Sequence, residues 1–150
     1  MKSFLLAVCL SCSSLLLFSS TAIASTEDTA NTEITKLLEQ AIHENVKQMK
    51  AENIEGTMAT IHTKSNLYAS SKSLISRLFD IYELDYEIID IKFIAHQDEL
   101  AYVRVKQLTK KVTGPAFKNN ELDMVQIFKQ EDGKWKIWSQ ANMSVVFLDQ

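Results

Sequence analysis

Three histidines, His43, His62 and His96, are the side chains of this sequence best suited to proton transfer or metal binding near neutral pH. Only His43 has carboxylates close by along a helix, namely Glu39 and Glu44. No His or carboxylate set shows the paired spacing that transition-metal sites use. We therefore expect no metal site.

Nucleophilic and phosphate chemistry also lack support. Both cysteines, Cys9 and Cys12, lie in an apolar N-terminal segment, and no serine stands in a Gly-x-Ser-x-Gly turn. The three glycines, Gly56, Gly114 and Gly133, are too dispersed to form a phosphate-binding loop. We expect no cofactor.

Acid–base chemistry remains open, because it needs only a buried carboxylate and hydroxyl donors around a dry pocket. Alternation along the chain puts Asp90 and Tyr86 on the same side as Lys92, which favours a solvated carboxylate. The candidates by residue type are Asp90, Asp123, Tyr68, Tyr82, Tyr86 and Tyr102.

Uncharged polar residues interrupt apolar strand faces at three places: Gln107, Gln126 and Ser139. If these faces line one cavity, their side chains converge as hydrogen-bonding groups in apolar surroundings, which is the usual composition of a small-molecule site. The alternative is that each lies near a strand end or a wet rim. Trp135 and Trp138 are expected on opposite faces, one in the core and the other at a ligand, surface or dimer contact.

The N-terminus has the pattern of a cleaved export signal. Lys2 precedes the apolar stretch 4–18, and Ala22-Ile23-Ala24 provides a small-x-small cleavage site. The apolar stretch is shorter than the roughly 20 residues of a spanning helix. We expect a signal peptide over 1–24, a flexible leader over 25–32 and one folded domain over 33–150, exported to the periplasm or the extracellular space, without stable membrane insertion after cleavage.

Charge limits the partners. Removal of Lys2 with the signal would take the net charge from −3 to −4. This mild acidity disfavours nucleic acid as a partner.

The elements that position these side chains change character near Leu84. Apolar residues recur at helical spacing over 34–49, 54–62 and 71–82. Beyond Leu84 the period becomes two, which predicts strands over 86–95, 100–112, 121–130 and 134–146. Asp132-Gly133 suits the tight turn of a terminal hairpin, since both residues readily adopt positive φ. The face with Ile89, Ile91 and Phe93 is expected to be apolar.

Three helices followed by an antiparallel meander predict an α+β domain, with N-terminal helices packed on a strongly curved sheet. The sequence resembles the NTF2-like superfamily, including SnoaL-like and ketosteroid-isomerase-like domains. The resemblance rests on the second helical segment 51–62, which ends in His62, and on the hairpin segment 132–138. It implies a cone-shaped fold with His62 near its mouth.

We therefore expect an exported, non-catalytic NTF2-like domain that binds a small apolar or amphipathic ligand or a protein partner, as a homodimer. The alternative is a cofactor-independent isomerase, dehydratase or cyclase that uses acid–base chemistry in the cone. A third possibility is an association domain whose cone is filled by its own side chains. The candidate ligand-binding residues are His62, Gln107, Gln126, Ser139 and Trp138.

Overall fold

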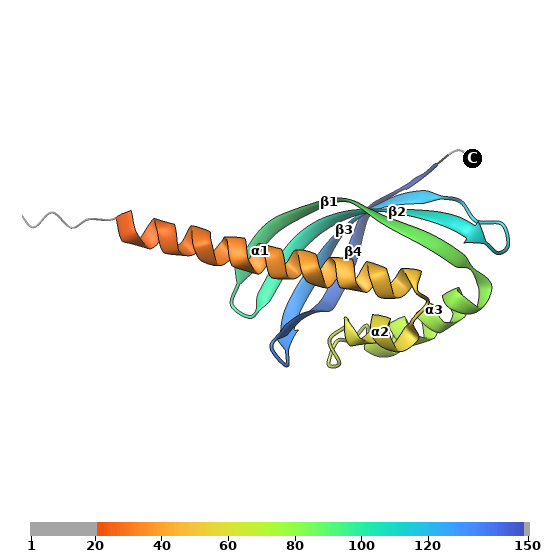
Figure 1. The fold of residues 1–150 in the computed structure, drawn as a ribbon, viewed down its shortest axis with the longest axis horizontal. Helices are drawn as coiled ribbons and strands as arrows, with labels where there is room; N and C mark the ends of the chain where they lie inside the picture. Colours follow the sequence, from red (N-terminus) through yellow and green to blue (C-terminus); the bar gives the residue numbers. More distant parts are fainter. Residues whose placement is uncertain (1–20, 149–150) are drawn as a thin grey trace, which may run out of the picture.

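The computed structural model describes residues 21–148, and the first 20 residues of the expected signal segment lie outside this range. Three helices precede a four-stranded sheet: α1 (Thr21–Lys50), α2 (Ile54–Ala59), α3 (Tyr68–Ile81), β1 (Glu83–Gln97), β2 (Leu100–Thr113), β3 (Asn120–Glu131) and β4 (Lys134–Phe147). The strands form one antiparallel sheet in the order β1-β2-β3-β4. The sheet curves around α1, and α2 and α3 close one end (Figure 1). The predicted fold class is confirmed.

Helix α1 packs on the sheet through one stripe. Leu38, Ile42 and Val46 recur every four residues and are 1%, 2% and 8% exposed. The N-terminal part of α1 extends past the strands (Figure 1). Residues 25–32, which we expected to form a flexible leader, lie within this helix.

Helix α2 begins where Asn53 Oδ1 accepts a hydrogen bond from the Gly56 amide at 3.0 Å, which is an N-cap. We expected this helix to end at His62, but it ends at Ala59. Ile61 then forms an isolated parallel bridge with Ile137 of β4, in which the His62 amide donates to the Ile137 carbonyl at 3.0 Å and the Ile137 amide donates to the Thr60 carbonyl at 2.9 Å. His62 therefore does not cap a helix.

The terminal hairpin turns as predicted. Asp132 and Gly133 have φ angles of 52° and 71°, and positive values at both positions are the requirement of a type I′ turn. All four predicted strands are present, and each differs from its expected bounds by only a few residues.

Two β-bulges reverse the predicted faces. Ile89 is an extra residue in β1, since Ile88 pairs with Gln107 and Asp90 with Lys106. The bulge places Tyr86 in the interior at 5% exposure and leaves Ile89 47% exposed. Our expectation that Tyr86 shares the solvated face, and that Ile89 shares the apolar face, is wrong for this reason.

The second bulge lies in β4 at Trp138, because Ile137 pairs with Phe128 whereas Ser139 pairs with Ile127. Phe128 is fully buried on the inner face, so its neighbour Ile127 faces outward. Ser139 consequently shares the outer side with Ile127. Our expectation that it continues the face of Ile137 is wrong.

The main core fills the space between α1 and the inner face of the sheet. Every strand except β1 contributes at least one buried side chain to it, and β1 adds partly buried ones. Its buried members are Leu38, Ile42, Ala101, Val103, Val105, Met124, Phe128, Trp135 and Ile137.

Candidate functional site

A cavity of about 390 Å³ lies between the helices and the inner face of the sheet, beside the main core. We call it the cone cavity. Its volume falls within the range of small-molecule sites. All three helices, their connections and all four strands contribute to its lining: Asn45, Met49, Thr57, Ile61, Leu67, Ser71, Ile75, Tyr86, Gln107, Leu122, Met124, Gln126, Ile137, Gln140 and Asn142.

Two of the predicted site residues, Gln107 and Gln126, meet in this lining from neighbouring strands. The strand periodicity located both correctly. Gln140 and Asn142 of β4 join them and were missed, because the bulge at Trp138 exchanges the residues that face inward. The cavity therefore has a polar side made of amide groups from β2, β3 and β4.

These amides are connected. Gln126 Nε2 donates to Gln140 Oε1 at 3.0 Å, and Gln140 Nε2 donates to Asn142 Oδ1 at 3.4 Å. We call these three residues the amide row. It runs from the buried Gln126 to the exposed Asn142 at the edge of the sheet.

Two polar atoms of the lining residues lack a protein partner among the described residues. They are Thr57 Oγ1 and Gln126 Oε1, whose residues are 1% and 6% exposed. A buried polar group without a hydrogen bond costs about 1–3 kcal/mol. Both atoms therefore favour a partner that the protein itself does not supply.

Tyr86 adds a hydroxyl to the lining. Burial, followed by the charge of Glu52, raises the pKa of Tyr86 from 10.0 to about 12. The phenol is therefore neutral at physiological pH and can both donate and accept a hydrogen bond.

The carboxylates considered for acid–base chemistry do not line this cavity. Asp123 lies against Arg104, whose Nε and Nη2 each donate to it at 2.7 Å. These hydrogen bonds, and then the charge of Arg104, lower the pKa of Asp123. Asp90 lies 3.3 Å from Lys92 with its side chain 39% exposed. Among the described lining residues none is charged, and none is a histidine.

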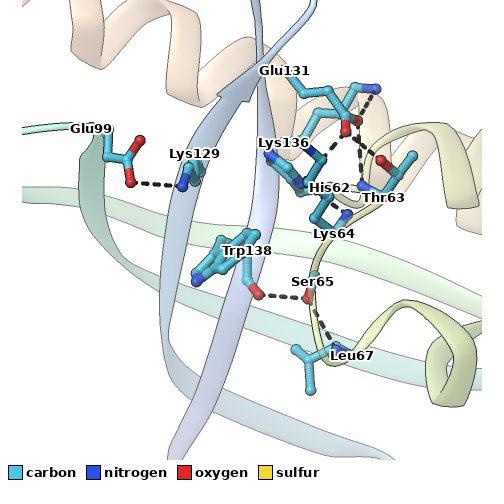
Figure 2. Close-up of polar contacts among 10 residues, drawn as sticks. All are labelled: His62, Thr63, Lys64, Ser65, Leu67, Glu99, Lys129, Glu131, Lys136 and Trp138. Carbon is cyan, nitrogen blue, oxygen red and sulfur yellow. Dashed lines mark hydrogen bonds and ion pairs between the residues drawn. The ribbon is translucent and has the colours of Figure 1, made fainter.

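His62 lies in a separate polar cluster, which joins residues 62–65 to the terminal hairpin (Figure 2). Its ring is 4% exposed, and its Nδ1 accepts a hydrogen bond from the Lys64 amide at 3.1 Å. That bond requires an unprotonated Nδ1. Glu131 Oε1, 3.5 Å from Nδ1, is therefore not hydrogen-bonded to it in this state.

Glu131 is the centre of this cluster. It accepts hydrogen bonds from Lys136 Nζ at 2.7 Å, from the Thr63 amide at 3.3 Å and from the Thr63 hydroxyl. Figure 2 shows these groups converging from the loop and the hairpin. The cluster fixes the loop that forms one end of the cone.

Trp138 belongs to the same region. Its ring lies edge to face with His62, at 4.9 Å between centroids, and Lys129 Nζ lies 4.8 Å from its centre. Its carbonyl accepts from Ser65 Oγ at 2.7 Å (Figure 2). His62, Ser139 and Trp138, predicted as site residues with Gln107 and Gln126, thus lie outside the cone cavity lining.

Two larger hollows, of about 460 and 590 Å³, flank Leu37 along α1. Charged side chains from the helix and the hairpin ends line both of them. Trp135 borders each, and its Nε1 has no partner among the described residues. The cone cavity differs in having only neutral lining residues, and two of them have an unpaired buried atom.

Potential metal ligands were considered next. Within residues 21–148, no group of three or more His, Cys, Asp or Glu side chains is placed to hold a metal ion. No helix of this range is both long and apolar enough to cross a membrane.

Helices closing a curved four-stranded meander around a cavity form an NTF2-like fold, and comparison with solved structures confirms this fold. Residues 40–148 match the family described as the C-terminal domain of the anti-sigma-I factor RsgI9, and the chain belongs to that family. No curated protein matches the chain in sequence.

Several solved structures share the fold. A candidate scytalone dehydratase from Novosphingobium aromaticivorans has 13% identity and a TM-score of 0.66, covering 83% of this chain and 93% of that one. A candidate aromatic ring hydroxylase from the same organism has 9% identity and a TM-score of 0.66, covering 78% and 94%. An NTF2-like protein of unknown function from Pseudomonas putida has 11% identity and a TM-score of 0.61, covering 73% and 84%. At such identities the likeness concerns the fold alone.

Proposed function

We propose that the domain binds a small, uncharged, amphipathic molecule in the cone cavity and performs no reaction on it. The observation that carries this proposal is the lining itself, in which buried amide and hydroxyl groups oppose apolar side chains and two buried polar atoms are unpaired. A pocket of this composition orients a ligand through a few polar contacts and binds it mainly through apolar contact.

The acid–base alternative needs a titratable group within reach of the substrate. Asp90 and Asp123 are ion-paired away from the lining, and His62 lies in the loop cluster. Tyr86 is the titratable residue among the described lining residues, and its high pKa makes it a poor proton acceptor near neutral pH. The geometry supports binding over catalysis.

Native mass spectrometry of the full chain, exposed to a mixture of small metabolites, tests the proposal. The matched variants are Ser71→Trp, at the cavity lining, and Ser73→Trp, exposed on the same helix and outside the lining. We expect wild type and Ser73→Trp to retain the same small molecule and Ser71→Trp to lose it. Retention by Ser71→Trp, an empty wild type, or conversion of the bound molecule with time would contradict the proposal.

We also propose that the protein is exported. The support is the sequence alone: Lys2, the apolar stretch 4–18 and the small residues Ala22 and Ala24. Protein recovered from outside the cytoplasm should begin at Ser25 when its N-terminus is sequenced. An intact Met1 on protein confined to the cytoplasm would refute export.

A further inference from the structure

The orientation of the amide groups in the amide row decides whether the cone cavity presents a hydrogen-bond donor or an acceptor to a ligand. Gln126 Nε2 points to two acceptors, Gln140 Oε1 at 3.0 Å and the weak acceptor Met124 Sδ at 3.9 Å. Reversing Gln126 alone would set its oxygen against Gln140 Oε1, and reversing the three amides of the row together would still set it against the Met124 sulfur, which is a weak acceptor and not a donor. The present orientation is therefore preferred, and Gln126 Oε1 is the atom without a partner.

Gln126 Oε1 is a hydrogen-bond acceptor, so it requires a donor from the ligand. Thr57 Oγ1, which comes from α2 rather than from the sheet, is the other unpaired buried atom among the described lining residues and can donate or accept. Both atoms are almost inaccessible to solvent, so a ligand group that reaches them supplies hydrogen bonds that the free protein lacks.

The absence of charged residues from the described lining further limits the chemical class of the ligand. The described lining residues include no Lys, Arg, His, Asp or Glu, so an ionised ligand group would lose its hydration without gaining a counter-ion. A carboxylate would also present only acceptors to Gln126 Oε1, which is itself an acceptor.

We propose that the ligand is neutral and carries a primary carboxamide on an apolar body, with its N–H donating to Gln126 Oε1 and its carbonyl accepting from Thr57 Oγ1. An alcohol ranks second, because its hydroxyl can donate to Gln126 but provides a single polar atom. This assignment rests on the proposed function of the cone cavity, and it adds the chemical class of the occupant.

Four probes with one apolar body test the ranking: phenylacetamide, 2-phenylethanol, phenylacetate and 2-phenylethylammonium. Their affinities for the full chain are compared by calorimetry or ligand-observed NMR at neutral pH. We expect phenylacetamide to bind most tightly, at least about 10-fold better than phenylacetate, since each satisfied buried group contributes on the order of 1 kcal/mol and the charge is penalised further. Equal or tighter binding of phenylacetate, or no binding of any probe, would overturn the assignment.

Two variants test whether Gln126 causes the preference for the amide probe. Gln126→Met replaces the amide with an apolar side chain of similar length and so removes the acceptor, whereas Gln130→Met changes an exposed glutamine of the same strand. We expect phenylacetamide affinity to fall about 10-fold in Gln126→Met and to be unchanged in Gln130→Met. Unchanged affinity in folded Gln126→Met would refute the contact. If Gln126→Met does not fold, the wild-type ranking decides.

The ligand class and the proposed function can fail separately. If Ser71→Trp abolishes retention of a natural small molecule while the four probes show no amide preference, the cavity binds ligands but the assigned class is wrong. If Ser71→Trp changes nothing in either experiment, both fail.

Discussion

Glu131 Oε2 lies 2.7 Å from Lys136 Nζ, and the two side chains are 15% and 14% exposed. Their contact spans the turn of the terminal hairpin, and Thr63 adds hydrogen bonds from the loop after α2. The hydrogen bond from Lys136, followed by that from Thr63, lowers the pKa of Glu131 from 4.5 to about 2. The unfolded chain therefore binds this proton more readily than the folded chain, so the contribution of Glu131 is complete above about pH 4.5 and is lost as pH falls toward 2.

Replacing Glu131 with Gln should lower the free energy of unfolding at neutral pH and flatten its decline between pH 5 and pH 2. Denaturant unfolding of wild type and variant at several pH values measures this difference. The control is Glu87→Gln, an exposed residue of β1. Parallel pH curves for wild type and Glu131→Gln would show that the contact does not couple folding to protonation.

The raised pKa of Tyr86 should make the stability of the fold decrease as the pH rises in the alkaline range. Its pKa of about 12 in the folded chain exceeds the ordinary 10.0, so ionisation favours the unfolded state above pH 10, and stability decreases as pH rises toward 12. Tyr86→Phe should remove the latest step of the tyrosinate absorbance titration and reduce the alkaline loss of stability. Tyr102→Phe serves as the comparison at a half-buried tyrosine. A late step that persists in Tyr86→Phe would refute the assignment.

Phe128 is fully buried where α1 meets the sheet. Phe128→Ala should therefore destabilise the domain by about 3–5 kcal/mol, through lost apolar contact and the cavity left behind. Leu74→Ala removes an apolar side chain that is 58% exposed, and its effect should stay within about 0.5 kcal/mol. Chemical denaturation of both variants measures the difference, and similar losses would contradict the location of the core.

The edge of β4 offers a surface through which the expected homodimer could form. Residues 60–62 cover β4 near Ile137, but residues 139–147 follow without a single charge and include Val146 and Phe147, which are 53% and 61% exposed. A sheet edge without charged residues readily pairs with another strand. Wild type should have the mass of a dimer in light scattering, and Val146→Lys should shift it to monomer, unlike Leu74→Lys on α3. A monomeric wild type at high concentration would exclude this pairing.

The periodicity of the sequence was sufficient to predict the elements but not all of their faces. The change of period near Leu84, the Asp132-Gly133 turn and the inward position of Gln107 and Gln126 are confirmed. Tyr86 and Ser139 were assigned to the wrong sides, because one extra residue in a strand reverses every position beyond it. The bulges that cause these two errors lie at Ile89 and Trp138, neither of which carries a turn signal, so only the pairing of the strands reveals them.

The same bulges explain why several residues of the cavity lining were not predicted from the sequence. Gln140 and Asn142 become cavity residues only after the bulge at Trp138, and Tyr86 only because of the bulge at Ile89. Thr57 lies on a short helix, where six residues are too few for periodicity to identify the buried side. Contacts between distant segments, such as Thr63 with Glu131, leave no local pattern in the sequence.

The uneven burial along α1 has a consequence for how the domain can be handled. Among the side chains that the structure describes, from residue 29 onward, contacts with the core begin at Ile34, about 20 Å along the helix axis from Thr21, and the first buried one is Leu38. Trimming by a protease, or fusion to a carrier protein, anywhere ahead of Ile34 would thus spare the core contacts of the helix. A shortened chain and the complete one should melt at nearly the same temperature and hold the same guest molecule.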